Sequence, residues 1–155
     1  VFGCPKNRVI TALEDIKIVE DFLLCIAEEA WNNGVMIALE ANPTIYQTNF
    51  VNTTIEACNL VKRLNHPGLK INLDVSTILV NDESLDFISS HIGWINHVHI
   101  SEAYLKPLQR RLLHNQLYEI LKINGYENCI SLEMAKPENM QSLYQSIVYM
   151  KEVFS

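Results

Sequence analysis

Four polar side chains with metal-ligand chemistry each follow a short apolar run that has the pattern of a buried strand. They are Glu40, Asp74, His99 and Glu133. The carboxyl ends of parallel strands lie at one edge of a sheet, where ligands bind, so we expect these side chains to converge. Three carboxylates and one imidazole suit Mn²⁺ or Mg²⁺, and the imidazole also accommodates Co²⁺. Without a cation, the clustered carboxylates would repel one another. For each acid alone, the alternative role is a loop cap or a surface contact.

The elements that must position these residues alternate along the chain. Apolar runs predict strands at 35–40, 69–74, 95–100 and 129–133, and residues 1–2 look like the end of another strand. Helical spacing predicts helices near 11–33, 53–65, 82–91, 112–124 and 137–153. The first two helices open with capping-box patterns, Thr11 to Glu14 and Thr53 to Glu56.

Alternating strands and helices predict a parallel α/β sheet with right-handed crossovers. No Pro-, Gly- or Ser-rich linker interrupts the chain, so we expect one domain over residues 1–155. Two architectures remain open, a doubly wound open sheet and part of a (β/α)8 barrel. Five units would fill an open sheet but only part of a barrel of about 250 residues. Length favours the open sheet, whereas the residues at the strand ends favour the barrel.

Charge and cysteine usage narrow the function classes. Among the 155 residues, 12 are Lys or Arg and 18 are Asp or Glu, giving a net charge of −6. Such an acidic chain is not typical of a general nucleic-acid binder, and its apolar runs are too short to span a bilayer. The four cysteines form no C-x-x-C pair, and Cys25, Cys58 and Cys129 have the pattern of small buried side chains. We therefore expect a cytoplasmic protein without a membrane partner. His91 and His114 have the pattern of helix-surface residues.

Several other residues are candidate substrate contacts. Lys6 and Arg8 follow the first expected strand and could bind a hydroxyl or a phosphate, or be a solvated loop pair. Asn42 lies just beyond Glu40, where a turn before Pro43 is the alternative role. His97 lies two residues before His99 and shares its strand face, so one of the two could simply support the other.

Several motifs together resemble a known family. They are Val1-Phe-Gly-Cys-Pro-Lys-Asn-Arg8, Leu39-Glu-Ala-Asn-Pro43, Tyr46-Gln-Thr-Asn-Phe50, Asn65-His-Pro67, Leu73-Asp74, His97-Val-His-Ile-Ser-Glu102, and Gly125-Tyr126 with Ser131-Leu-Glu133. This set resembles the xylose-isomerase-like TIM barrels, and more narrowly the sugar phosphate isomerases/epimerases. The resemblance extends over essentially the whole chain and implies strands four to eight of a barrel. It also implies that the first three βα units lie outside this chain.

The resemblance assigns roles to individual residues. It implies that Glu40, Asp74, His99 and Glu133 are the metal ligands, and that Glu40 and Glu133 are also the catalytic acid/base pair. The related ketose 3-epimerases usually have a histidine where this chain has Thr77 and an arginine where it has Leu105. These departures put 3-epimerase activity on free ketoses in doubt. Glu102 is a further candidate substrate contact, with an ordinary loop acid as the alternative.

The expected function is therefore a divalent-metal-dependent sugar or sugar-phosphate isomerase or epimerase. It would transfer a proton α to a carbonyl through an enediolate. The alternatives are a polyol dehydratase, an endonuclease-IV-like enzyme of the same superfamily and a non-catalytic partial barrel. A partial barrel would have two unpaired strand edges, which a homo-oligomer could cover.

Overall fold

The computed structural model describes residues 8–137 and 139–155. Lys6, Cys4 and the expected strand end at residues 1–2 lie outside the described residues. The strands are β1 (Ile37–Glu40), β2 (Leu69–Asp74), β3 (Ile95–Ser101) and β4 (Cys129–Glu133). The α-helices are α1 (Glu14–Asn32), α2 (Thr54–Leu64), α3 (Val75–Asn81), α4 (Ile88–His91), α5 (Leu112–Ile123) and α6 (Met140–Phe154). Short 3-10 helices cover Thr44–Tyr46, Ile92–Trp94 and Ala103–Leu105.

The four strands form one parallel sheet in the order β1-β2-β3-β4. Each strand pairs with the next one in the chain, so the order never reverses. A doubly wound sheet reverses its strand order at a switch point, whereas a barrel adds its strands one after another. The sheet is open, and its order is that of a partial TIM barrel. The alternative of a doubly wound sheet is therefore wrong.

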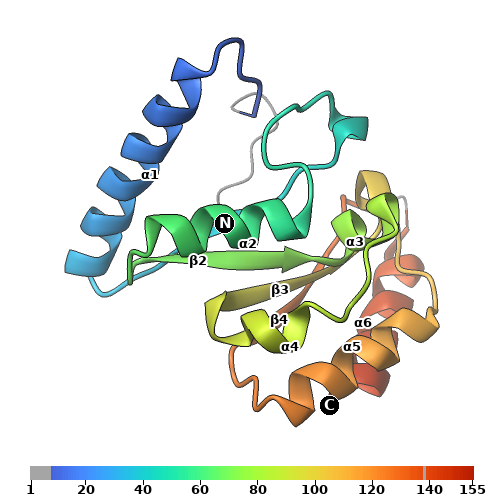
Figure 1. The fold of residues 1–155 in the computed structure, drawn as a ribbon. Coiled ribbons are helices and arrows are strands. Elements are labelled where there is room, and N and C mark those ends of the chain that lie inside the picture. Colours follow the sequence, from blue (N-terminus) through green and yellow to red (C-terminus); the bar gives the residue numbers. More distant parts are fainter. Residues whose placement is uncertain (1–7, 138) are drawn as a thin grey trace.

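In Figure 1, α1 and α2 lie above the strands, α4 and α5 lie below them, and the chain ends on α6. Helices α1 and α2 contact β1 and β2, while α6 contacts β4 and α5 packs on α4 and α6. Buried aliphatic side chains form two clusters, one around β1, α1 and α2 and one around β3 and α5. Gly68 permits the close approach of α1 to the start of β2. A Cβ there would lie 2.2 Å from the carbonyl oxygen of Ala27.

Local sequence signals explain the helix boundaries only in part. The capping box of Thr53 and Glu56 is formed at the start of α2. The capping box expected for Thr11 and Glu14 is not formed. Instead, the Asp15 carboxylate accepts hydrogen bonds from the Thr11 and Ala12 amides, and α1 begins at Glu14. The prediction of a single helix over residues 82–91 is also wrong. Helix α3 starts directly after Asp74, and the chain turns at Asp82 in a left-handed conformation before α4.

Four expectations about exposure are wrong. Cys25 and Cys129 are exposed, and of the three only Cys58 is buried as expected. His91 and His114 are buried rather than on helix surfaces. The His91 ring bonds the carbonyl of Phe87, and the His114 ring bonds the hydroxyl of Tyr149. Each buried imidazole thus has a polar partner, and for His114 this partner lies 35 residues away on α6, beyond what helical spacing could reveal.

None of the described helices is both long enough and apolar enough to cross a membrane.

Candidate metal centre

Three of the four expected ligands meet at the carboxyl edge of the sheet. Glu40 ends β1, Glu133 ends β4 and His99 lies on β3 between them. One ligand atom from each lies within 4.8 Å of the other two. His99 Nδ1 is 3.2 Å from Glu133 Oε2 and 3.6 Å from Glu40 Oε1. This is the spacing of groups that could share one cation.

The pKa shifts of Glu40 and His99 describe the electrostatics of this cluster. Burial raises the pKa of Glu40, and the nearby charges of Asp74 and Glu133 add to that effect. Burial lowers the pKa of His99, but its contacts with Glu133 and Glu40 outweigh burial and raise that pKa to about 9. In the metal-free protein, the imidazolium therefore supplies the positive charge between the two carboxylates.

Asp74 lies beside this group but its carboxylate is already occupied. It accepts hydrogen bonds from the backbone amides of Ser76 and Thr77, which makes it the N-cap of α3. It also accepts from the hydroxyls of Ser76, Thr77 and Ser101. Both oxygens are therefore in use within the chain. Direct metal ligation by Asp74 remains a prediction, and it requires some of these hydroxyls to turn away.

Two residues of the strands support His99. The buried Asn72 side chain places its Nδ2 3.0 Å from His99 Nδ1, and it can donate to that nitrogen only while Nδ1 carries no proton. The His97 ring packs edge-on against the His99 ring at 4.9 Å between centroids, and His97 Nε2 lies 2.7 Å from the Ser131 hydroxyl. Burial lowers the pKa of His97, and the neighbouring His99 lowers it further. These contacts favour a supporting role for His97, while its role as a substrate contact stays a prediction.

Arg8 and Asn42 lie around Glu40. The buried Arg8 guanidinium donates to the carbonyl oxygen of Glu40 over 2.7 Å, which anchors the end of β1. Burial lowers the pKa of Arg8 to about 10, and the Glu40 charge partly offsets this effect. Asn42 lines the pocket in front of Glu40, and its backbone carbonyl accepts hydrogen bonds from Thr48 and Asn52. Substrate contact by either residue stays a prediction.

The structure places Glu102 in a different environment from the ligands. Its carboxylate pairs with Arg111 through two hydrogen bonds of 2.7 and 2.6 Å and also accepts from the Gln109 amide. The side chain is buried and does not line the pocket of the ligands. Its geometry is that of a loop acid that fixes the segment between β3 and α5.

The pocket at the cluster brings loops from distant parts of the chain together. Its lining residues are Glu40, Ala41, Asn42, Pro43, Tyr46, Asp74, Ser76, Leu105 and Glu133. Sequence reasoning did not select Tyr46 or Ser76 as site residues, and it noted Leu105 only as a departure. Thr77, the other departure, is buried and donates to Asp74 and to the carbonyl of Ala41. Ser101 could have been found, because it lies two residues after His99 on the same strand face.

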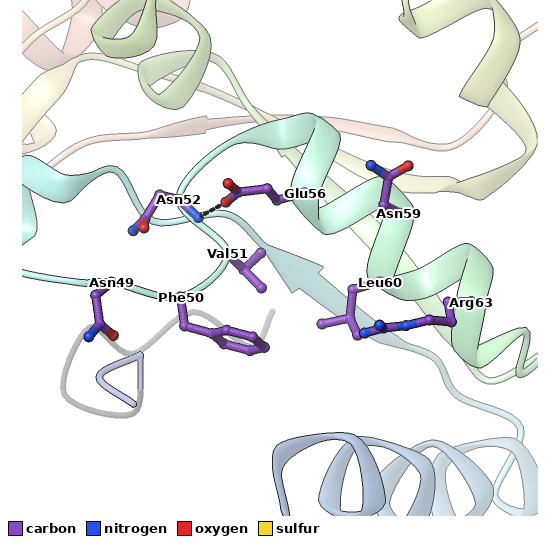
Figure 2. Close-up of a pocket in the computed structure, with 8 residues that line it drawn as sticks. All are labelled: Asn49, Phe50, Val51, Asn52, Glu56, Asn59, Leu60 and Arg63. Carbon is purple, nitrogen blue, oxygen red and sulfur yellow. Dashed lines mark hydrogen bonds between the residues drawn. The ribbon is translucent and has the colours of Figure 1, made fainter. Parts of the chain in front are cut away.

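Another pocket lies between α2 and the loop before it (Figure 2). Its single carboxylate, Glu56, already accepts from the amides of Asn52 and Thr53 as part of the capping box. Arg63 pairs with Glu20 of α1. Among the described residues, the Glu40, His99 and Glu133 group is the one cluster with metal-ligand spacing.

Comparisons with known proteins agree with this architecture. A family model described as xylose isomerase-like TIM barrel matches residues 5–153. The chain is structurally similar to 3-keto-D-glucoside 4-epimerase from E. coli, with 21% identity and a TM-score of 0.80 over 96% of this chain and 58% of that one. It is also similar to D-psicose 3-epimerase from Clostridium cellulolyticum H10, with 18% identity and a TM-score of 0.78 over 95% of this chain and 59% of that one.

A third similar structure is an AP endonuclease of family 2 from Brucella melitensis. It shares 22% identity and a TM-score of 0.71, over 86% of this chain and 52% of that one. A search of curated proteins finds no match. The chain thus spans less than three fifths of each of these structures, and at this identity the likeness establishes the fold.

Proposed function

The chain belongs to the xylose isomerase-like TIM barrel family, and from this we propose that it provides the metal centre and acid/base pair of a sugar isomerase or epimerase. The observation that supports the proposal is the group of Glu40, His99 and Glu133 at the carboxyl edge of the sheet. In barrels of this kind, that edge carries the active site.

The residues present fit a divalent cation. Two carboxylates and an imidazole offer hard oxygen donors and one nitrogen, a set suited to Mn²⁺ or Mg²⁺ and compatible with Co²⁺. Contacts with Glu133 and Glu40 raise the pKa of His99 to about 9, which shows that the two carboxylates favour a positive charge beside them. We propose that Glu40, His99 and Glu133 hold the ion, with Asp74 as a fourth ligand once its hydroxyl partners turn away.

The proposed reaction is proton transfer at a carbon beside a carbonyl. A bound divalent ion would stabilise the negative charge that develops on the substrate oxygens. One glutamate carboxylate removes the proton, and the electron pair of the C–H bond moves towards the carbonyl oxygen. The other glutamate, in its protonated form, returns a proton to the opposite face or to the neighbouring carbon. Glu40 and Glu133 are the proposed pair, one acting as the base and the other as the acid.

The substrate class is proposed from the same relatives. The D-psicose 3-epimerase structure contains D-tagatose, and a D-allulose 3-epimerase from Methylomonas sp. was solved with D-allulose. We propose a small sugar or sugar phosphate as the partner of this chain. Domain limits of 1–155, a cytoplasmic location and the absence of a nucleic-acid or membrane partner belong to the same proposal.

Self-association of the chain is a further part of the proposed function. Helix α6 exposes Met140, Tyr144 and Ile147, which lie three and four residues apart, and α1 exposes Ile18 and Phe22. No described strand pairs with the outer edges of β1 and β4. We propose that a second copy covers part of this surface, and light scattering of the purified chain measures its oligomeric state.

The AP endonuclease among the similar structures makes DNA cleavage the competing function. That activity requires further metal-ligating histidines. Instead, His66 pairs with Glu28, and His91 and His114 lie buried against Phe87 and Tyr149. The described residues thus contain one candidate centre rather than several. The polyol dehydratase and the non-catalytic partial barrel remain alternatives. Turnover of a cyclic polyol tests the first, and metal binding tests the second.

The experiment is a calorimetric titration with Mn²⁺ followed by turnover assays on ketoses, sugar phosphates, a cyclic polyol and DNA with an abasic site. We expect one Mn²⁺ per chain, and Glu133→Gln should abolish epimerisation while the fold is retained. Glu127→Gln, which removes an acid from the loop before β4, is the matched control. Absence of Mn²⁺ binding, or turnover by Glu133→Gln equal to that of the wild type, would refute the proposal. Cleavage of abasic DNA would favour the endonuclease.

A further inference from the structure

The mouth of the ligand pocket has an apolar side that the metal ligands do not explain. Tyr46 from the β1–α2 loop and Leu105 from the β3–α5 loop both line the pocket that contains Glu40, Asp74 and Glu133. Beside them, Ile45 is 40% exposed, Tyr104 60% and Leu105 37%. We call Ile45, Tyr46, Tyr104 and Leu105 the apolar rim. Its surface continues from inside the pocket out to solvent.

The two loops of the apolar rim are joined to each other. The Tyr104 amide donates to the Tyr46 hydroxyl over 3.0 Å, and the two rings meet edge to face at 5.6 Å between centroids. The segments are far apart in the sequence, so this contact exists only in the folded protein. The aromatic pair therefore has a defined geometry beside the carboxylates.

The backbone of the rim is held in an unfavourable conformation. Tyr104 and Leu105 both have positive φ, at 59° and 54°, although neither is a glycine. Such conformations are uncommon for large side chains and tend to persist where surrounding contacts enforce them, often at functional sites. Here the Leu105 amide donates to the Glu102 carbonyl, and the Leu105 carbonyl accepts from Ala135. Arg111 in turn fixes Glu102 through two hydrogen bonds.

Charge on the pocket wall selects against an anionic group at this place. The pocket has three carboxylates, and no described lining residue is a lysine or arginine. Lys106, which follows Leu105 in the chain, lies over the Tyr104 ring at 6.0 Å from its centroid. An aromatic or aliphatic substituent would bury rim surface without leaving a charge unpaired.

We infer that the apolar rim binds an apolar substituent of the substrate, so that the chain prefers a neutral sugar that keeps a free carbonyl for the proposed reaction and carries an alkyl or aryl group at another carbon. This inference rests on the proposed function, whose substrate it specifies. Tyr46 and Leu105 are then specificity-determining residues. The polar end of the sugar points to the carboxylates, and the substituent lies against Tyr46 and Leu105.

The test compares the binding of three probes to the full chain by calorimetry, in excess Mg²⁺ and separately in EDTA. The probes are phenyl β-D-glucopyranoside, methyl β-D-glucopyranoside and glucose 6-phosphate. Covering part of a phenyl ring should make the phenyl glucoside bind about tenfold more tightly than the methyl glucoside. Leu105→Asn should reduce this preference to about threefold or less. Asparagine tolerates positive φ better than leucine does, so the variant should keep its fold.

Two further variants complete the design. Leu112→Asn removes an exposed leucine that does not line the pocket, and it should leave the preference unchanged. Tyr46→Phe keeps the ring and removes the hydroxyl that accepts from Tyr104, so it should retain most of the preference.

The glucoside measurements test the apolar rim, and they do so independently of the proposed function. Equal binding of the two glucosides, no binding of either, an unchanged preference in Leu105→Asn, or tighter binding of glucose 6-phosphate than of the phenyl glucoside would overturn the inference. The rim is made by protein loops, so the phenyl preference should persist in EDTA. The Mn²⁺ titration tests the metal centre independently. A chain that fails to bind Mn²⁺ but keeps the phenyl preference would refute the metal centre and leave the apolar rim in place.

Discussion

His99 Nδ1 lies 3.2 Å from the Glu133 carboxylate, so an imidazole of β3 forms an ion pair with the residue that ends β4. Glu40 Oε1 lies 3.6 Å from the same nitrogen. The nitrogen that faces both carboxylates is the atom best placed to bind a metal together with them. In the metal-free protein it carries a proton instead. Proton and metal therefore compete for one position.

This competition predicts that metal binding is coupled to proton release. A ligating histidine must be neutral, and contacts with Glu133 and Glu40 raise the pKa of His99 to about 9 despite its burial. Near pH 7.5 we expect about one proton to be released per Mn²⁺, and affinity to rise about tenfold per pH unit until the pH approaches that pKa. Calorimetry in two buffers with different ionisation enthalpies measures the release. Identical enthalpies in both buffers would contradict the prediction.

Asp74→Ala should destabilise the fold as well as alter the metal centre. The substitution removes the N-cap of α3 and the carboxylate that accepts from the buried hydroxyls of Ser76, Thr77 and Ser101, of which Thr77 keeps the Ala41 carbonyl as a second acceptor. We expect a loss of about 2–4 kcal/mol in the free energy of unfolding, measured by urea denaturation without metal. Asp86→Ala, at an exposed loop position, is the control and should change stability by less than about 0.5 kcal/mol. Equal stabilities of the two variants would show that the capping network contributes little.

Glu102→Gln tests whether Glu102 serves the loop or the substrate. Its bidentate pair with Arg111 is mostly buried, so the variant should lose about 1–3 kcal/mol of stability. A double-mutant cycle with Arg111→Gln should give a coupling energy of about 1 kcal/mol or more. Mn²⁺ affinity should be unchanged. If stability is retained while glucoside binding weakens, Glu102 is a substrate contact, as the sequence resemblance suggested.

His114 should make the protein less stable in mild acid. Burial lowers the pKa of His114, so protonation is easier in the unfolded state than in the folded one. This contribution to stability is complete well above the ordinary value of about 6.5 and is lost as the pH falls below it. His114→Asn can keep a hydrogen bond to Tyr149 but cannot be protonated near pH 6. Urea midpoints at pH 7.5 and 5.5 should therefore differ less in the variant than in the wild type, and equal differences would contradict the prediction.

The sequence alone determined the parallel α/β organisation and the carboxyl ends of β1, β2 and β4, and it placed the end of β3 one residue too early. Strand and helix periodicity are local properties, as are the Thr53–Glu56 capping box and the turn that ends α2. Because parallel strands present their carboxyl ends on one edge, the positions of Glu40, His99 and Glu133 near one another also followed from the strand pattern. The strand order of a barrel was suggested by the residues at the strand ends, and the structure then established it.

Only the tertiary structure decided which atoms each of these side chains contacts. Asp74 accepts a hydrogen bond from Ser101 of the next strand, 27 residues away, and this contact occupies one of its carboxylate oxygens. Likewise, Tyr149 of α6 covers His114, and no periodicity within α5 could predict that burial. The physical reason is that periodicity fixes the face on which a side chain lies, whereas packing between distant segments fixes its hydrogen-bond partners and its exposure. The apolar rim arises in the same way, since Tyr46 and Tyr104 belong to two loops that meet only in the folded chain.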